Sequence, residues 1–217
     1  MVVGVLCVPA TLFFDPAMPL QSRVDPFGEL RAVAARGLMM GNRGGRFHDA
    51  QRKLTSRRWA SRQWICCILD FKNRHRSVFG DGYTELFFLD EVTALAAGHR
   101  PCFECRRKDA ERFAGLFSAG KQRARAPAID DVLHAERLVG KEKRLHRCKI
   151  DTLSDGAMIT CGSDAFALRG GHLLRWTPFG YDEAHSRPAG DVDVLTPPSI
   201  LAVLARGYMP LWHPSAG

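Results

Sequence analysis

The sequence lacks the glycine-rich motifs of several common enzyme classes. Its 217 residues contain no P-loop, no G-x-G-x-x-G dinucleotide fingerprint and no G-x-S-x-G nucleophile motif. Internal repeats and low-complexity tracts are also absent. These absences argue against the familiar nucleotide-binding, dinucleotide-binding and serine-hydrolase patterns. What remains is an ordinary globular composition, with 46% hydrophobic and 25% charged residues.

Long hydrophobic runs are missing as well. The apolar N-terminal stretch is interrupted by Pro9 and Pro16, and it has neither a basic start nor a clean cleavage site. It is too short and too broken to span a bilayer. We therefore predict that residues 1–24 form a loosely ordered leader, with Met18 as an alternative start, and that the protein does not bind membranes.

Acidic residues are fewer than basic ones. There are 23 Asp and Glu against 31 Lys and Arg, which gives a formal net charge of +8 and favours nucleic acid as a partner. The seven cysteines are an odd number and mostly lie far apart, unlike the framework of a disulfide-rich secreted domain. We therefore expect a reducing compartment, the cytoplasm, where a Cys-x-x-Cys pair more often binds metal or is redox-active.

The clearest motif is the Cys102-Phe103-Glu104-Cys105 pair, which follows Pro101. Two intervening residues bring both sulfurs to one side of a turn, where they can hold half of a tetrahedral zinc site. A thioredoxin-like pair would follow a strand in a βαβ unit, whereas this one follows a helix. Unliganded cysteines at a helix start are the alternative. We predict that Cys102 and Cys105 bind zinc with two further ligands.

Four segments between about residues 40 and 107 occur in a characteristic order: Gly41-Asn42-Arg43, Phe47-His48, Phe87-Phe88, and the run from His99 to Arg106. Through these segments the chain resembles the Ada-type zinc-binding domain. This is the zinc domain of the adaptive-response alkylation-repair protein, and it also occurs in nucleases and DNA-uptake proteins. The resemblance implies a zinc-stabilised unit in which His48 is the third ligand and replaces the methyl-accepting cysteine, so alkyl transfer is not expected.

Two departures from the Ada-type pattern concern the fourth ligand. The position four after His48 is Arg52 instead of cysteine, and the spacing from His48 to Cys102 is longer than in that family. The added length contains the apolar Trp-Ile-Cys-Cys stretch, which can supply the missing thiolate. Neighbouring strand residues point to opposite faces, so only one of Cys66 and Cys67 should bind, and we predict Cys66. Packing in an apolar core is the alternative role for both cysteines.

Basic residues concentrate between positions 36 and 62, where Asp49 is the single acid. Arginine side chains neutralise phosphates, and aromatic side chains stack on unpaired bases. A second basic group directly follows Cys105. We predict a nucleic-acid-binding face, for DNA more than RNA and with a role in DNA repair or processing, formed by Arg43, Arg46, Arg57, Arg58, Trp59, Arg106 and Arg107.

The alternative function is a zinc-dependent hydrolase of deaminase or nuclease type that acts on nucleotides or nucleic acid. Together, the Cys102/Cys105 pair and His134-Ala135-Glu136 contain the elements of the zinc-deaminase signature, in which the glutamate carries the proton. Their order is reversed relative to deaminases, so His134 and Glu136 are catalytic candidates in this alternative only. A binding protein should close its zinc site with four protein ligands, whereas an enzyme needs an open position.

The order of expected elements indicates an α+β fold in two units. Residues 25–120 should form the Ada-like metal-binding domain with a hairpin insertion, and a basic connector at 118–127 should separate it from the rest. Residues 128–217 should form a β-rich, barrel-like domain that ends in a helix capped by Ser199. In the first unit we expect helices at 25–36, 91–97 and 102–117 and strands at 64–71, 76–79 and 83–89. In the second we expect a helix at 131–138 and strands around 149–153, 157–161, 165–168 and 173–176.

Overall fold

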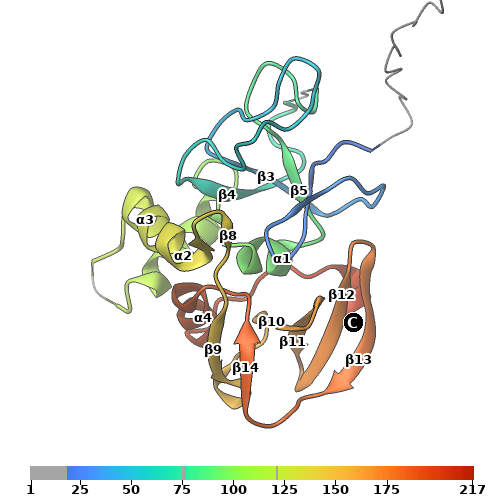
Figure 1. The fold of residues 1–217 in the computed structure, drawn as a ribbon. Coiled ribbons are helices and arrows are strands. Elements are labelled where there is room, and N and C mark those ends of the chain that lie inside the picture. Colours follow the sequence, from blue (N-terminus) through green and yellow to red (C-terminus); the bar gives the residue numbers. More distant parts are fainter. Residues whose placement is uncertain (1–18, 75–76, 121) are drawn as a thin grey trace, which may run out of the picture.

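The computed structural model describes residues 19–74, 77–120 and 122–217, and these form two six-stranded β-sheets with helices packed between and beside them (Figure 1). The predicted mixture of helices and strands is confirmed. Most of the predicted leader, residues 1–18, lies outside the described residues. The remainder of that prediction is wrong, because Arg23–Val24 form a strand that pairs with two others.

The N-terminal sheet is built from β1 (Arg23–Val24), β2 (Leu30–Arg31), β3 (Met39–Arg43), β4 (Trp64–Ile68), β5 (Leu86–Phe88) and β6 (Arg100–Pro101). Its order is β2-β1-β5-β3-β4-β6. β1 is parallel to β5 and β4 is parallel to β6, while the other neighbours are antiparallel. The parallel β4–β6 pair matters most for function, since the Cys-x-x-Cys motif begins directly after β6.

The C-terminal sheet is built from β9 (His146–Lys149), β10 (Met158–Cys161), β11 (Asp164–Arg169), β12 (His172–Thr177), β13 (Gly180–Ser186) and β14 (Asp191–Val194). All pairs are antiparallel, in the order β13-β12-β11-β10-β14-β9. The predicted barrel is wrong: within the described residues, the edge strands β13 and β9 do not pair and the sheet stays open. Three of the four expected strands are present as β10, β11 and β12, whereas residues 150–152 form a 3-10 turn.

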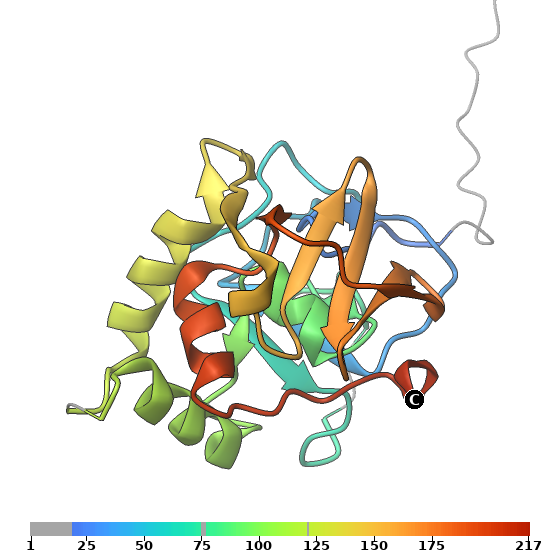
Figure 2. The ribbon, with the colours of Figure 1, turned by 90° about the horizontal axis from the view of Figure 1, so that it is seen from below.

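Four α-helices connect and cover the two sheets in the described chain: α1 (Glu91–Ala96), α2 (Arg107–Phe117), α3 (Ala126–Arg137) and α4 (Pro198–Ala205). α1 lies between the sheets (Figure 1). α2, α3 and α4 contact one another and form a layer along one side of the molecule (Figure 2). After α3 the chain forms a short ribbon of β7 (Leu138–Val139) and β8 (Glu142–Lys143), and a 3-10 turn at Pro214–Ala216 ends it.

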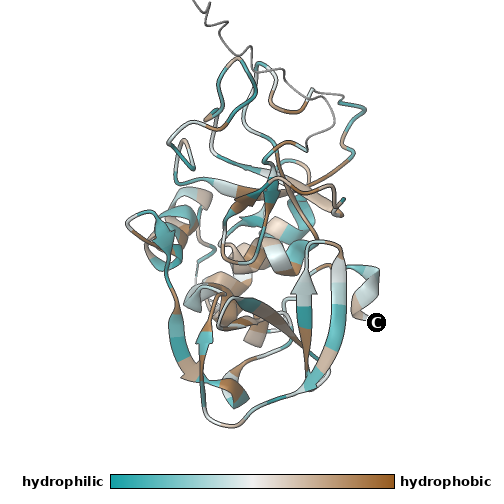
Figure 3. Cartoon of the chain, turned by 45° about the vertical axis from the view of Figure 1, so that its right-hand side comes forward, coloured by the Kyte–Doolittle hydropathy of each residue, from teal (hydrophilic) through white to brown (hydrophobic). Residues whose placement is uncertain are grey.

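One hydrophobic cluster crosses the predicted domain boundary. It combines Leu95 of α1, Phe113 of α2 and Ile129 of α3 with Ile159 and Ile200 from the C-terminal half. Apolar segments accordingly gather where the helices and sheets meet (Figure 3). The connector at 118–127 therefore does not separate two independent cores.

Two predicted elements near the start of the chain are wrong. Residues 25–29 form a turn and not a helix, because the Asp25 carboxylate accepts from the Glu29 amide at 2.9 Å and the Asp25 carbonyl accepts from the Gly28 amide at 2.9 Å. Residue 76 of the return strand expected at 76–79 lies outside the described residues. Residues 77–79 are not in a strand, and β4 pairs with β3 and β6 instead.

The helix ends follow capping chemistry only in part. Asp90 caps α1 as predicted, and its carboxylate accepts from the Thr93 amide at 2.9 Å. Ser199 is not the cap of α4, which begins after Pro197. The Ser199 amide and hydroxyl instead donate to the Glu136 carboxylate at 2.9 and 2.6 Å, which joins α3 to the start of α4.

Candidate metal centre

The alternation of β4 decides which cysteine reaches the metal centre. Trp64 and Cys66 are buried on one face of β4, where Cys66 shares a cluster with Ala94 of α1. Period two places Ile65 and Cys67 on the other face. Cys67, Cys102 and Cys105 form a group in which the three sulfur atoms lie within 4.8 Å of one another. The prediction of Cys66 is therefore wrong, and Cys67 takes its place.

The parallel pairing of β4 and β6 brings the two parts of the group together. Cys66 is opposite Pro101, and the Cys102 amide donates to the Cys66 carbonyl at 3.0 Å. This contact places Cys102 beside the strand position of Cys67. Residues 102–106 then turn toward α2, as the Arg106 amide donates to the Cys102 carbonyl at 3.0 Å, and the turn returns Cys105 to the group.

The three sulfurs suit one zinc ion. A Zn–S bond of ~2.3 Å in tetrahedral geometry separates two sulfurs by ~3.8 Å, which falls within the 4.8 Å that bounds the sulfur separations of the group. Hydrogen bonds from the Cys105 and Cys67 thiols to the Cys102 sulfur hold the pKa of Cys102 far below its usual range. Donating to Cys102 raises the pKa of Cys67 and of Cys105. The Glu104 amide also donates to the Cys102 sulfur at 3.4 Å. These residues can hold a metal ion, and their thiolates are the donors that zinc prefers.

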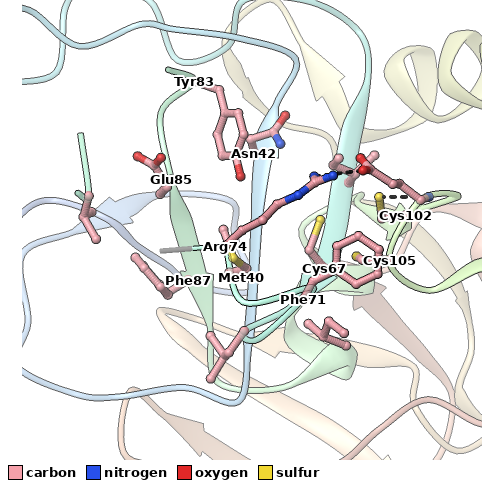
Figure 4. Close-up of a pocket in the computed structure, with 15 residues that line it drawn as sticks. Met40, Asn42, Cys67, Phe71, Arg74, Tyr83, Glu85, Phe87, Cys102 and Cys105 are labelled. Atoms are coloured by element: carbon pink, nitrogen blue, oxygen red, sulfur yellow. Dashed lines mark hydrogen bonds and ion pairs between the residues drawn. The ribbon is translucent and has the colours of Figure 1, made fainter. Parts of the chain in front are cut away.

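The thiol group opens onto a pocket of about 400 Å³, which we call the thiol pocket (Figure 4). Its floor is the outer face of β3, β4 and β5, with Met40, Asn42 and Phe87. Glu85 also lines the pocket, is only 4% exposed, and accepts from the Phe79 amide at 2.8 Å. The pocket therefore combines soft metal donors with a buried carboxylate and an amide side chain.

A cation lies at the rim of the thiol pocket. The Arg74 guanidinium forms an ion pair with Glu104 at 2.8 Å and reaches across the pocket above the sulfurs (Figure 4). Both side chains are about half exposed, so this pair contributes little to stability and can open for a ligand. The remaining lining residues are mostly apolar: Ile65, Ile68, Leu69, Phe71 and Val78.

A buried ion pair fixes the backbone that carries the motif. Arg106 and Glu91 form two hydrogen bonds of 2.8 Å and are almost fully buried. Glu91 also accepts from the Tyr208 hydroxyl at 2.7 Å and from the Leu211 amide at 3.0 Å. The Glu91 carboxylate and the Arg106 guanidinium thus have hydrogen-bond partners in the interior. These contacts anchor the end of the motif to α1 and to the C-terminal segment.

His48 is not a ligand of this group. Its Nδ1 lies 2.8 Å from the Thr84 hydroxyl and its Nε2 lies 2.8 Å from the Gly80 carbonyl, and its ring stacks on Phe79 at 4.9 Å. Both ring nitrogens are occupied in a buried site, so the predicted role as third ligand is wrong. The imidazole instead holds the loop before β5.

The residues of the deaminase alternative lie elsewhere. Glu136 binds Ser199 at the start of α4, and His134 contacts Arg137 at 2.9 Å and the edge of Trp59 at 5.8 Å. Neither belongs to the thiol group. Their assignment as catalytic residues of a deaminase-type site is therefore wrong.

The predicted nucleic-acid face is divided between surface and interior. Arg43 and Arg106 are 2% and 4% exposed, so both are interior residues and the prediction is wrong for them. Arg46, Arg57 and Arg107 are exposed, and Arg58 and Trp59 are partly buried. A hollow of about 380 Å³ contains three of these residues and is lined by Ser56, Arg57, Arg58, Trp59, Ala60 and Lys141.

Sequence reasoning missed Cys67 and the lining of the thiol pocket. The signal for Cys67 was available, because a tryptophan expected in the core assigns Cys66 to the same face and Cys67 to the opposite one. None of the helices in the described part of the chain has the length and apolar character needed to cross a bilayer. Comparison of the chain with protein-family models, curated proteins and solved structures found no match.

Proposed function

We propose that the protein is a zinc-dependent hydrolase whose metal is held by Cys67, Cys102 and Cys105 and whose substrate occupies the thiol pocket. The number of donors carries this proposal. Among the described residues, no fourth histidine, cysteine or carboxylate joins the three thiols. Structural zinc sites are closed by four protein ligands, whereas catalytic sites use three and keep one position for water or substrate. An incomplete ligand set facing a pocket favours the catalytic alternative over a purely structural zinc.

The chemistry of the pocket supports a polar substrate of nucleotide size. A volume of about 400 Å³ lies in the range of small-molecule sites, roughly 300–1,000 Å³. Arg74 can bind an anionic group and Asn42 can bind a carbonyl or amine, while Glu85 can accept or donate a proton. Zinc in the thiol site would add a Lewis acid next to these groups. We therefore propose nucleosides and nucleotides as the substrate class.

The test uses zinc-loaded protein with a panel of nucleosides and nucleoside monophosphates. Release of ammonia or inorganic phosphate is measured. Glu85→Gln keeps an acceptor for the Phe79 amide but cannot move a proton, so turnover should fall by about 100-fold or more while zinc content stays unchanged. Arg74→Ala should raise KM more than it lowers kcat. Fully zinc-loaded protein without turnover on the whole panel would contradict the proposal.

Nucleic-acid binding with a structural zinc is the second candidate. The hollow lined by Arg57, Arg58, Trp59 and Lys141 favours it, since cations beside a partly exposed aromatic ring suit a single strand. Binding of a DNA and an RNA oligonucleotide should then weaken as salt increases. Loss of one phosphate contact in Arg57→Ala should reduce the slope of log K against log salt by about 0.7 for a single strand. A binding constant that does not depend on salt would remove this candidate.

A further inference from the structure

Three cations gather on the inner face of the N-terminal sheet, opposite the thiols. Arg43 of β3 and Arg137 of α3 lie against the Trp64 ring, with guanidinium carbons 3.9 and 3.8 Å from its centroid. Lys143 of β8 joins them, and its ammonium donates to the Ala96 carbonyl. Arg43 is 2% and Arg137 is 1% exposed. Lys143 is partly buried, and the repulsion within such a group of cations is offset only when an anion is present.

Glu29 lines the same small space as these cations, but no carboxylate among the described residues forms an ion pair with them. Arg43 donates to the Gly28 carbonyl at 2.7 Å, and Arg137 donates to the Gly98 and Arg62 carbonyls at 3.0 and 2.7 Å. Among the described residues, none of the three cations forms an ion pair with an Asp or Glu side chain. By contrast, the equally buried Arg100 and Arg106 each form two bonds to a carboxylate.

Two buried donors in the cluster have no acceptor. The Trp64 Nε1 and Arg137 Nε atoms make no hydrogen bond, although both side chains are almost fully buried. The same side chains line a small space of about 20 Å³ together with Arg43 and Lys143, which we call the cation chamber. Buried N–H groups without acceptors are rare in folded proteins and point to a missing partner.

The cation chamber adjoins the surface. Arg58, Trp59 and Lys141 line both the chamber and the hollow of about 380 Å³. The chamber has room for one atom of about the size of a water oxygen. The hollow can hold the remainder of a larger group. A ligand with one oxygen in the chamber and its bulk in the hollow would therefore contact both sets of cations.

Electrostatics of the isolated chain agree with a missing anion. Burial, together with repulsion between the cations, lowers the pKa of Arg137 to about 8 and of Lys143 to about 7. Burial also lowers the pKa of Arg43 to about 9, partly opposed by the carboxylates of Asp25 and Glu29. A bound oxyanion would reverse these shifts, because it favours the charged form of each group.

We propose that the cation chamber and the adjoining hollow form a binding site for a phosphate group. One phosphoryl oxygen accepts from Trp64 Nε1 and Arg137 Nε, and the other oxygens face Arg58 and Lys141. Trp59 lies at the border of chamber and hollow and supplies a stacking surface for a base attached to that phosphate. The site is independent of the proposed hydrolase chemistry, since Trp64 and Cys67 lie on opposite faces of β4.

The test measures binding to the zinc-loaded full-length protein by calorimetry and by thermal unfolding. The ligands are inorganic phosphate, a nucleoside monophosphate, and two oligonucleotides that differ only in a 5′-phosphate or a 5′-hydroxyl. We expect phosphate to raise Tm, and the nucleotide to bind about tenfold more tightly than phosphate because of stacking. If the protein prefers the 5′-phosphorylated strand, the phosphate belongs to a strand end. If it binds both strands equally, the phosphate belongs to a free nucleotide.

Two variants separate binding from folding. Lys141→Ala removes an exposed cation, so it should fold normally and weaken phosphate binding about tenfold, whereas Lys149→Ala at an exposed site on β9 should not change it. Lys143→Met removes a repelling charge, and it should raise Tm without ligand while abolishing the phosphate-dependent rise. The proposal is overturned if phosphate does not bind the wild-type protein, or if phosphate binds Lys141→Ala as tightly as it binds Lys149→Ala. Such a result would leave water as the chamber's occupant.

Discussion

Cys67 carries the chemistry that distinguishes the two faces of β4. It belongs to the thiol group, whereas Cys66 lies in the core with its sulfur 3.8 Å from the Arg106 guanidinium. Burial raises the pKa of Cys66, which keeps it a neutral thiol. Adjacent residues of the same type therefore have different roles, because the strand turns their side chains in opposite directions.

Serine substitutions at the two positions test this division. Cys67→Ser should lower zinc affinity by about 100-fold, since one of three thiolate ligands should contribute about 3 kcal/mol, a part of the roughly 10–16 kcal/mol known for zinc in zinc-finger peptides. Cys66→Ser should keep one zinc per chain and lose about 1–3 kcal/mol of unfolding free energy through a buried hydroxyl. Zinc content by elemental analysis and urea unfolding separate these effects. Equal loss of zinc in both variants would contradict the assignment.

His48 provides a second residue-scale test. In His48→Ala the Thr84 hydroxyl and the Gly80 carbonyl lose their contact with the imidazole, although Thr84 keeps the Phe47 amide, so unfolding free energy should fall by about 2–4 kcal/mol. Zinc stoichiometry should not change, as the imidazole is no ligand. Loss of zinc from a variant that is still folded under the assay conditions would restore His48 as a ligand.

At the scale of elements, the Arg106–Glu91 pair joins the start of α2 to α1. Glu91→Gln leaves the buried Arg106 cation with only the half-exposed Asp109 carboxylate as its charged partner and should cost about 3–5 kcal/mol in urea unfolding. The matched control is Glu111→Gln, which breaks the more exposed Arg107–Glu111 pair and should cost less than about 1 kcal/mol. Similar losses in both variants would mean that the buried pair does not anchor the motif.

Local patterns predicted some of these elements and not others. The Asp90 cap and the apolar run of β4 are strong local signals, so the sequence predicts α1 and β4, and the structure contains both. The expected helix after Asp25 is not formed, because the Asp25 carboxylate closes a turn at Glu29 and β2, which follows this turn, pairs with β1. Propensity alone does not report such tertiary competition.

The candidate site shows the same limit. Cys102 and Cys105 are found from sequence because their spacing is local, and they lie together in the structure. Cys67 and Glu85 join them only through the parallel β4–β6 pair and the outer face of β5. The resemblance to the Ada-type domain suggested His48 as a ligand, but hydrogen bonds to Thr84 and Gly80 occupy both of its nitrogens.

At the scale of the whole molecule, the buried cations make stability depend on pH. Burial, with repulsion from Arg43 and Arg137 and partial opposition from Asp25, lowers the pKa of Lys143 from its usual 10.5 to about 7. Between these values the unfolded chain binds more protons than the folded chain, so stability increases as pH rises from about 7. The increase is at most about 1.4 kcal/mol per pH unit for each proton.

Urea unfolding of zinc-loaded protein between about pH 7 and pH 9, without phosphate, measures this dependence. The wild-type midpoint should rise across the interval, and Lys143→Met should show a smaller rise from a higher starting value. A midpoint that falls with pH in both proteins would contradict the assignment of a depressed Lys143 pKa.

The central claim is that three thiolates hold a zinc ion with an open position toward the thiol pocket. X-ray absorption at the zinc edge of the purified, zinc-loaded protein tests it most directly. We predict one zinc per chain with three sulfur neighbours at about 2.3 Å and one light neighbour that an added exogenous ligand such as azide displaces. A fourth protein ligand, either sulfur or imidazole, that azide does not displace would contradict the open site, and a chain that binds no zinc would contradict the whole account.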